Sequence, residues 1–253
     1  MIPQQNQQHV LTEDFARYEF KYLLNADQCN VIEHEVAQFM KYDGFVHPEL
    51  GNRYIVRSLY FDNRMTTHYF DKIDGIRHRR KFRIRTYSRI SNSPTPIFLE
   101  EKGRHIDRTF KTRIPLMLED IKSFTSPSES MLVDWRFAEN ELFQRFVFSR
   151  ARLRTYPMVL VDYERRPYTS AFDLNFRITF DSHLRATATS ELFPSANKQW
   201  FETLAGHTVL EVKFHRRVPA WFHRIIKTHN LRRQSISKFC KGMEICGLAQ
   251  NLS

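Results

Sequence analysis

One stretch of the chain gathers cationic side chains at alternate positions. In a β-strand, successive side chains point to opposite faces, so every second residue shares a face. Read in this way, the stretch from Arg79 to Tyr87 places apolar Phe82 and Ile84 on one face. The opposite face carries Arg79, Lys81, Arg83 and Arg85. Either this face is solvated, as charged runs usually are, or it lines a cavity that binds a dense polyanion.

The same alternation recurs in other predicted strands, where one face is charged and the other is largely apolar. The charged faces comprise Arg17, Glu19 and Lys21; Glu100 and Lys102; Lys111 and Arg113; Arg165; Arg177, Thr179 and Asp181; and Glu211 and Lys213. If helices cover the apolar faces from outside, the charged faces point inward and converge on one channel. Because each phosphate group adds about one negative charge, many Arg and Lys donors in one place suit a triphosphate or a longer phosphate chain.

Three glutamates share these faces with the cations, each two residues before a lysine. Glu19, Glu100 and Glu211 belong to three separate predicted strands. Carboxylates do not bind anions, but they bind Mg²⁺ or Mn²⁺, which can bridge a carboxylate and phosphate oxygens. The pattern therefore predicts a metal site. The alternative interpretation is a set of cross-strand salt bridges on a solvated sheet.

These residues need a sheet that brings distant segments together. The predicted strands are residues 15–24, 55–61, 79–87, 97–102, 105–114, 157–167, 171–181 and 208–215, with a turn at Gly103. Helical apolar spacing marks residues 27–40, 65–70, 115–148, 219–231 and 235–248. Short turns between strands predict an α+β fold, an eight-stranded antiparallel β-barrel with helices packed outside. Residues 1–13 are predicted to form a disordered arm, and residues 14–253 a single domain.

The composition points to an anionic partner and a reducing compartment. The chain of 253 residues has a formal net charge of +11 and an isoelectric point near 9.7. Nucleic acid, a phosphate-rich small molecule and a membrane surface all fit such a charge. The three cysteines lack metal-ligand spacing, so free thiols in the cytoplasm are expected. Without a signal peptide or a run of ~20 apolar residues, membrane contact would be peripheral or through a separate partner protein.

Seven short motifs follow one another along the chain. They are Arg17-Tyr-Glu19-Phe-Lys21-Tyr22, Ser58-Leu-Tyr-Phe-Asp62, Arg80-Lys81-Phe-Arg83-Ile-Arg85-Thr-Tyr87, Leu99-Glu100-Glu-Lys102, Arg177-Ile-Thr-Phe-Asp181, Leu210-Glu211-Val-Lys213 and Ser235-Ile-Ser237-Lys238-Phe239. Together they resemble the VTC-type polyphosphate polymerase domain, a branch of the triphosphate tunnel metalloenzymes, over about residues 15–247. One departure is Gly103-Arg104, where the family has a more basic turn.

The resemblance implies an eight-stranded antiparallel tunnel in which the γ-phosphate of ATP is transferred to a growing polyphosphate chain. The implied ligands are ATP and polyphosphate or triphosphate, with Mn²⁺ or Mg²⁺ as cofactor. The residues expected to act on the transferred phosphate are Lys21, Arg83, Arg85, Lys102, Arg165 and Lys213. The resemblance adds Lys238 as a phosphate-binding position, and the alternating faces add Arg17, Lys81, Lys111 and Arg177. Glu211 is implied as the main metal ligand, with Glu19 and Glu100 in support.

Two other functions are open at this point. The same tunnel suits an inorganic triphosphatase or a nucleoside triphosphatase, because either water or a phosphate chain can accept the phosphoryl group. A nucleic-acid-binding protein is not expected, because the aromatic residues lie opposite the cations and not between them, where bases would stack. The carboxylates on the cationic face would also repel a nucleic-acid backbone.

Overall fold

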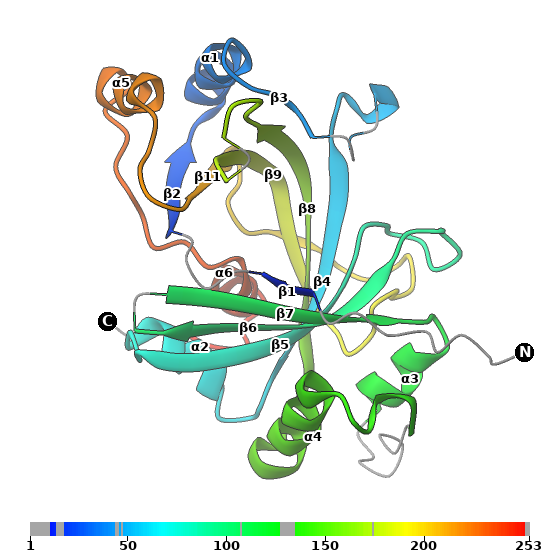
Figure 1. Cartoon of the computed structure of the whole chain (residues 1–253). Coiled ribbons are helices and arrows are strands. Elements are labelled where there is room, and N and C mark those ends of the chain that lie inside the picture. Colours follow the sequence, from blue (N-terminus) through cyan, green and yellow to red (C-terminus); the bar gives the residue numbers. More distant parts are fainter. Residues whose placement is uncertain are drawn as a thin grey trace, which may run out of the picture.

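One curved antiparallel sheet dominates the computed structural model, which describes residues 11–13, 18–43, 46, 48–106, 108–126, 135–173 and 175–250 (Figure 1). In these residues, the strands of seven residues or more are β2 (Tyr18–Leu24), β4 (Tyr54–Asp62), β5 (His78–Thr86), β6 (Ile97–His105), β7 (Arg108–Leu116), β8 (Tyr156–Thr169), β9 (Arg177–Ala188) and β11 (Thr208–Phe214). Three short strands extend the sheet, namely β1 (Leu11–Glu13), β3 (Lys41–Tyr42) and β10 (Phe201–Glu202). The predicted fold class and its eight long strands are confirmed.

The hydrogen-bonded path runs in the order β1-β7-β6-β5-β4-β8-β9-β11-β2, with β3 beside β8 and β10 beside β9. Every pairing is antiparallel. Within the described residues the path ends at β1 and β2 without a pairing that joins them. The sheet thus differs in one place from a barrel closed by hydrogen bonds. At that place β1 occupies the edge of β7.

The α-helices of the described residues are α1 (Ala26–Ala37), α2 (Thr67–Ile73), α3 (Asp120–Thr125), α4 (Glu141–Leu153), α5 (Ala220–Thr228) and α6 (Lys238–Ile245). Two 3₁₀ turns, η1 (Pro48–Leu50) and η3 (Trp135–Phe137), accompany them. The Ser237 side chain accepts a hydrogen bond from the backbone N–H of Cys240, which makes Lys238 the first residue of α6. None of these helices combines the length and the apolar character needed to cross a membrane.

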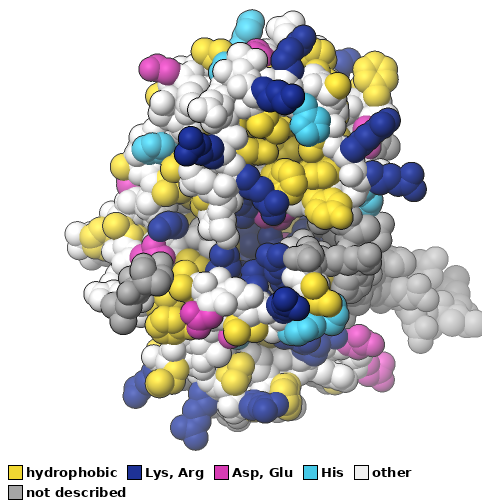
Figure 2. All heavy atoms as spheres, turned by 90° about the vertical axis from the view of Figure 1, so that its left-hand side faces the viewer, with side chains coloured by type: hydrophobic (Ala, Val, Ile, Leu, Met, Phe, Trp, Pro, Cys, Tyr) yellow, Lys and Arg dark blue, Asp and Glu magenta, His cyan; other side chains and the backbone are white. Residues whose placement is uncertain are grey.

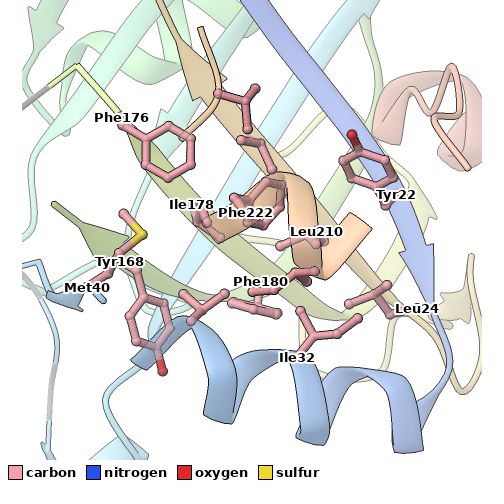
Figure 3. Packing of buried hydrophobic residues seen from close by; sticks show 14 of the residues in the cluster. Tyr22, Leu24, Ile32, Met40, Tyr168, Phe176, Ile178, Phe180, Leu210 and Phe222 are labelled. Atoms are coloured by element: carbon pink, nitrogen blue, oxygen red, sulfur yellow. The ribbon is translucent and has the colours of Figure 1, made fainter. Parts of the chain in front are cut away.

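Helices α1 and α5 cover the outer face of β2, β9 and β11 (Figure 3). Leu24, Ile178 and Leu210 from the three strands are fully buried, together with Ile32 of α1 and Phe222 of α5. Burying side chains of this size stabilises a fold by roughly 1.5–3 kcal/mol each. A slip of one residue would exchange the two faces of a strand, so this packing forces the alternate, charged residues inward.

Helices α3 and α4 cover the outer face of β5, β6 and β7. Phe82 and Ile84 of the basic strand are fully buried there beside Leu99 of β6 and Phe146 of α4. The rings of Phe82 and Phe146 meet edge to face, with centroids 5.4 Å apart. The apolar face of β5 therefore packs on a core, as the alternation predicts.

Helix α6 packs instead against the inner face of the sheet, at one end. Met243 of α6 is fully buried in a cluster that includes Val161 of β8. A Cβ atom at Gly242 would lie 3.0 Å from Cγ2 of Val161, so the helix backbone approaches the strand closely. This contact brings Lys238 into the interior of the sheet.

Several local predictions differ from the structure. The strand predicted over residues 171–181 begins only at Arg177 and continues to Ala188 as β9. The helical region predicted over residues 115–148 holds α3 and α4, and α4 continues to Leu153. Gly103 is not a turn but lies within β6 opposite Phe110, where a Cβ atom would sit 2.0 Å from Cζ of the Phe110 ring. A side chain at this position would force the Phe110 ring to move, and the turn falls at Ile106, which has a positive φ of 57°. Leu11–Glu13, assigned above to a disordered arm, form β1 on the edge of β7. The rest of that arm lies outside the described residues.

Candidate active site in the cavity of the sheet

A cavity of about 910 Å³ lies on the inner face of the sheet. Figure 2 shows the side of the molecule that is on the left in Figure 1. Lys and Arg side chains lie around and inside a hollow near the middle of this side. Of the predicted site residues, Glu19, Lys21, Lys81, Arg83, Arg85, Lys102, Lys111, Arg165, Arg177, Glu211, Lys213 and Lys238 line the cavity. Arg17 lies outside the described residues. Glu100 is described but does not line the cavity.

The basic strand β5 forms one wall. Arg83 and Arg85 are only 8% and 7% exposed, so the solvated interpretation is wrong for this part of the strand. Nε and Nη2 of Arg83 donate to Oε2 of Glu100 at 2.8 and 2.6 Å, and its Nη1 donates to the Tyr60 hydroxyl at 3.0 Å. Nε of Arg85 donates to Oγ of Ser58 at 2.9 Å. Contacts from β4 and β6 thus hold both guanidinium groups in place.

Glu100 lies beside Arg83, directly opposite it on the neighbouring strand β6. Its side chain is fully buried, and Oε2 accepts both hydrogen bonds from Arg83. Nε of Arg85 is 3.8 Å from the same oxygen, and Nζ of Lys111 is 3.9 Å from Oε1. A metal ligand must present an oxygen to the cavity, so this geometry favours a role in positioning Arg83 and Arg85 over the predicted role in metal binding.

Strands β8, β9 and β11 form the opposite wall around a second buried carboxylate. Nε and Nη2 of Arg165 donate to the two Asp181 oxygens, each at 2.7 Å, and Nζ of Lys238 lies 2.6 Å from Oδ2. Oε2 of Glu211 is 3.7 Å from both of these cations, and Oε1 is 3.3 Å from Nζ of Lys213. Asp181 is fully buried, whereas Glu211 lines the cavity. Asp181 therefore anchors the cations, and Glu211 faces the ligand space.

An ion pair between two side chains spans the open edge of the sheet. Nζ of Lys102 on β6 lies 3.2 Å from Oε2 of Glu19 on β2, although these strands are not hydrogen-bonded neighbours. Oε1 of Glu19 is 2.9 Å from Nζ of Lys21, which also donates to the Ile236 carbonyl at 3.0 Å. These contacts hold β2, β6 and the segment before α6 around the same space.

The remaining predicted cations are more exposed. Side-chain exposure is 20% for Lys111, 30% for Lys213 and 36% for Arg177, against 9% for Arg83. Arg177 forms an ion pair with Asp43. These three side chains are therefore more accessible to solvent than that of Arg83.

Two of the carboxylates that line the cavity, Glu19 and Glu211, are held in their ionised form. Burial alone would raise the pKa of Glu19, and Glu211 repels it, but Lys102 and Lys21 hold this pKa well below its usual range. Burial would also raise the pKa of Glu211, yet Lys213 and Lys21 keep it well below the ordinary value. Both groups are therefore carboxylates at neutral pH.

Two other groups titrate near neutrality. Burial would raise the pKa of Tyr60, but Arg83 and Arg85 outweigh it and lower the pKa to about 7. Burial lowers the pKa of Lys81 to about 8. The net charge of the cavity therefore falls as the pH rises through these values.

The carboxylates suit a divalent cation that is bound partly by its substrate. Glu19 and Glu211 both line the cavity and repel each other, a repulsion that a cation would relieve. Among the residues that the structure describes, no three His, Cys, Asp or Glu side chains gather into a metal site of their own. Mg²⁺ commonly uses only one or two carboxylates and completes its shell with water and substrate phosphates. The residues present fit such a site.

Three residues without a predicted role belong to the site. Tyr60 and Tyr163 line the cavity, and the Tyr163 hydroxyl accepts a hydrogen bond from Nη2 of Arg85 at 3.4 Å. Asp181 anchors Arg165, as described above. The alternation already placed Asp181 on a charged face. Tyr60 and Tyr163 also occupy alternate, inward-facing positions of their strands. The sequence does not distinguish them from core residues, however, because aromatic side chains are typical of a core.

Fold and site together define a tunnel-type antiparallel β-protein whose interior is rich in cations. The family model described as the VTC domain matches residues 16–246. The chain belongs to the VTC domain family, and the resemblance seen in its motifs is confirmed.

Two solved structures align with this chain at low sequence identity. A putative adenylate cyclase from Bacillus halodurans aligns with a TM-score of 0.51 and 12% identity, over 89% of this chain and 95% of that one. A putative adenylyl cyclase from Hippeastrum, described as having a dominant triphosphatase activity, aligns with a TM-score of 0.48 and 9% identity, over 88% and 93% of the two chains. The first of these supports a common fold. No functionally curated protein matches the chain.

Proposed function

We propose that this protein is a metal-dependent phosphotransferase that moves the γ-phosphate of ATP onto a growing polyphosphate chain. The observation that carries the proposal is the convergence of cations from β2, β5, β6, β8, β11 and α6 on one cavity of about 910 Å³ that also contains Glu19 and Glu211. A volume of this order holds ligands of nucleotide size. Membership of the VTC family supports polyphosphate as the acceptor.

The two walls would bind the transferred phosphoryl group from opposite sides. Phosphoryl transfer requires little covalent chemistry from the protein. It depends on placing the attacking and leaving oxygens in line and on neutralising the charge of the phosphates. Arg83 and Arg165 are each held by a fully buried carboxylate, Glu100 and Asp181 respectively. Donors fixed in this way need no reorganisation when charge develops in the transition state. Lys102, near the open edge, would bind the remaining oxygens.

Glu211 and Glu19 would hold Mn²⁺ or Mg²⁺, which when bound neutralises charge on the phosphate oxygens. Both side chains are ionised because neighbouring lysines lower their pKa values. Lys238, the first residue of α6, would bind phosphate at the end of the cavity where this helix begins.

The site does not favour nucleic-acid binding. Arg83 and Arg85 are almost completely buried, so a polynucleotide backbone could not reach them from the surface. Glu19 and Glu211 lie among the cations and would repel such a backbone. A triphosphatase would use the same cavity with water as the acceptor, and its products distinguish it from a polymerase.

The test is to incubate the purified protein with ATP and Mn²⁺ or Mg²⁺ and to separate the products on a gel stained for polyphosphate. We expect a ladder of chains, whereas free phosphate without a ladder would identify a hydrolase. Glu211→Gln should abolish turnover while the protein still unfolds cooperatively, and Glu202→Gln, at an exposed residue of β10, serves as the matched control. Full activity of the Glu211 variant would rule out the metal site.

A further inference from the structure

Two histidine side chains face each other at one end of strands β5 and β6. His78 begins β5, His105 ends β6, and the two residues lie directly opposite each other in the register of these strands. Just beyond them, the Ile106 N–H donates a hydrogen bond of 2.9 Å to the Arg77 carbonyl. The backbone beside the pair is therefore held in place, while the two imidazole rings are exposed and do not line the cavity.

The two rings meet through their Nδ1 atoms, which are 2.9 Å apart. The ring centroids are 4.4 Å apart and the ring planes are inclined by 67°, so the rings are not stacked face to face. One Nδ1–H donates to the other Nδ1, because a neutral imidazole has one donor nitrogen and one acceptor nitrogen. The pair thus presents two imidazole nitrogens with a single proton between them.

A transition-metal ion can take the place of that proton. Imidazole nitrogen binds Zn²⁺ at about 2.0–2.1 Å, and it suits Cu²⁺ and Ni²⁺ as well. Two nitrogens at this distance from one ion and at right angles to each other are about 2.9 Å apart. The separation of the two Nδ1 atoms therefore equals that of neighbouring ligands in the square arrangement that Cu²⁺ and Ni²⁺ prefer.

The described basic residues next to the pair are directed away from it or are neutralised. By alternation, Arg77, Arg79 and Arg104 point to the other face of the strands, where all three line a pocket. Arg80 shares the face of the histidine pair, but its Nη1 lies 3.2 Å from Oε1 of Glu101, which offsets its charge. The face that carries the two imidazole rings is thus less hostile to a metal ion than the opposite face.

We propose that His78 and His105 bind one divalent transition-metal ion of the kind that imidazole prefers, namely Cu²⁺, Ni²⁺ or Zn²⁺. The site is separate from the carboxylates of the cavity, whose oxygen atoms suit Mg²⁺ or Mn²⁺, and it does not depend on the proposed function. Among the described residues no third His, Cys, Asp or Glu side chain joins the pair, so water completes the coordination shell. A bound ion links β5 to β6 at this end of the sheet.

The test is a calorimetric titration of the full chain, freed of any affinity tag, with Ni²⁺ and with Zn²⁺. We expect one ion per chain to bind at a site that His78→Gln and His105→Gln each weaken by more than about tenfold, since changes in the outer shell of a metal site alone cost roughly 10–100-fold. His207→Gln combined with His223→Gln removes two exposed histidines elsewhere and is the matched control. Glu211→Gln should also leave this binding unchanged, which separates the pair from the cavity.

Two further readouts distinguish metal binding from a purely structural role of the pair. The electron paramagnetic resonance spectrum of bound Cu²⁺ should show two coordinating nitrogens in the wild type and one fewer in either single variant. Because the ion binds only the folded chain, Ni²⁺ should raise the midpoint of thermal unfolding of the wild type but not of the double variant.

An affinity for Ni²⁺ and Zn²⁺ that is equal in the wild type and the double variant would overturn the site. So would an equal loss in the His207 and His223 control, or a Cu²⁺ spectrum that does not change when both rings are removed. None of these results would bear on the phosphotransferase proposed above, because its assay uses Mn²⁺ or Mg²⁺ in the cavity.

Discussion

Replacing the buried carboxylate behind the basic strand is the most informative perturbation of this site. Glu100→Gln keeps the shape of the side chain and removes its charge. The Arg83 guanidinium then loses a partner that accepts two hydrogen bonds, at 2.8 and 2.6 Å, in a fully buried position. Removing one partner of a buried ion pair costs about 3–5 kcal/mol, because the other charge stays buried and uncompensated. We expect the free energy of unfolding to fall by about 3 kcal/mol, since glutamine retains one acceptor oxygen.

The pH dependence of this loss follows from the direction of the pKa shift. Burial would raise the pKa of Glu100, but Arg83 and Arg85 hold it well below the ordinary value. A carboxylate whose pKa is lowered by folding contributes stability above its unfolded pKa of about 4.3, and this contribution disappears as the pH falls through the folded pKa. The difference between wild type and variant, measured by urea unfolding, should therefore be constant around neutral pH and shrink in acid.

For ligand binding we expect Glu100→Gln to have the opposite effect, a gain in affinity where stability is lost. A bound polyanion can supply the counter-charge that Arg83 has lost, so the variant should bind inorganic triphosphate in the absence of metal more tightly than wild type. Two unit charges about 6 Å apart interact by about 3 kcal/mol at an effective dielectric constant of 20, and partial solvation reduces this to a gain of roughly tenfold in affinity. Calorimetric titration measures the change.

The adjacent residue provides a matched control. Glu101 is also fully buried on β6, but it points to the other face and pairs with Arg145 at 2.9 Å. Glu101→Gln should lower stability and leave triphosphate binding unchanged. The reasoning is refuted if Glu100→Gln is as stable as wild type at neutral pH, or if its affinity for triphosphate is unchanged or weaker. Loss of Mn²⁺ binding in Glu100→Gln, on the scale seen for Glu211→Gln, would restore Glu100 as a metal ligand.

Two further predictions concern the charge of the cavity and the packing of its wall. Triphosphate affinity should decrease as the pH rises through about 7 and 8, because Tyr60 gains a negative charge and Lys81 loses a positive one. Each group contributes up to about a tenfold loss per pH unit above its pKa, and Tyr60→Phe should remove its share from a titration of affinity against pH. Gly103→Ala should destabilise the protein by about 1–3 kcal/mol, because the new Cβ would lie 2.0 Å from Cζ of Phe110. Most of this loss should disappear in the double variant with Phe110→Ala, and a loss of the same size in both backgrounds would contradict the contact.

Local alternation was sufficient to predict which face each residue occupies. Phe82 and Ile84 pack on the core while Arg83 and Arg85 line the cavity, as period two requires. The turn predicted at Gly103 was wrong for a different reason: glycine serves both turns and close approaches of the chain, and only the position of Phe110 distinguishes them.

The sequence by itself therefore determined the cationic inner face, the strand content and the family. The tertiary structure decided how deep each of these residues lies. Glu100, Asp181 and Glu211 occur in the same alternating pattern, yet two are buried anchors and one faces the cavity. Alternation is a local property of a strand, whereas depth depends on how distant strands are staggered against one another. For the same reason the contact of Lys102 with Glu19 across the open edge appears only when segments far apart in the chain are brought together.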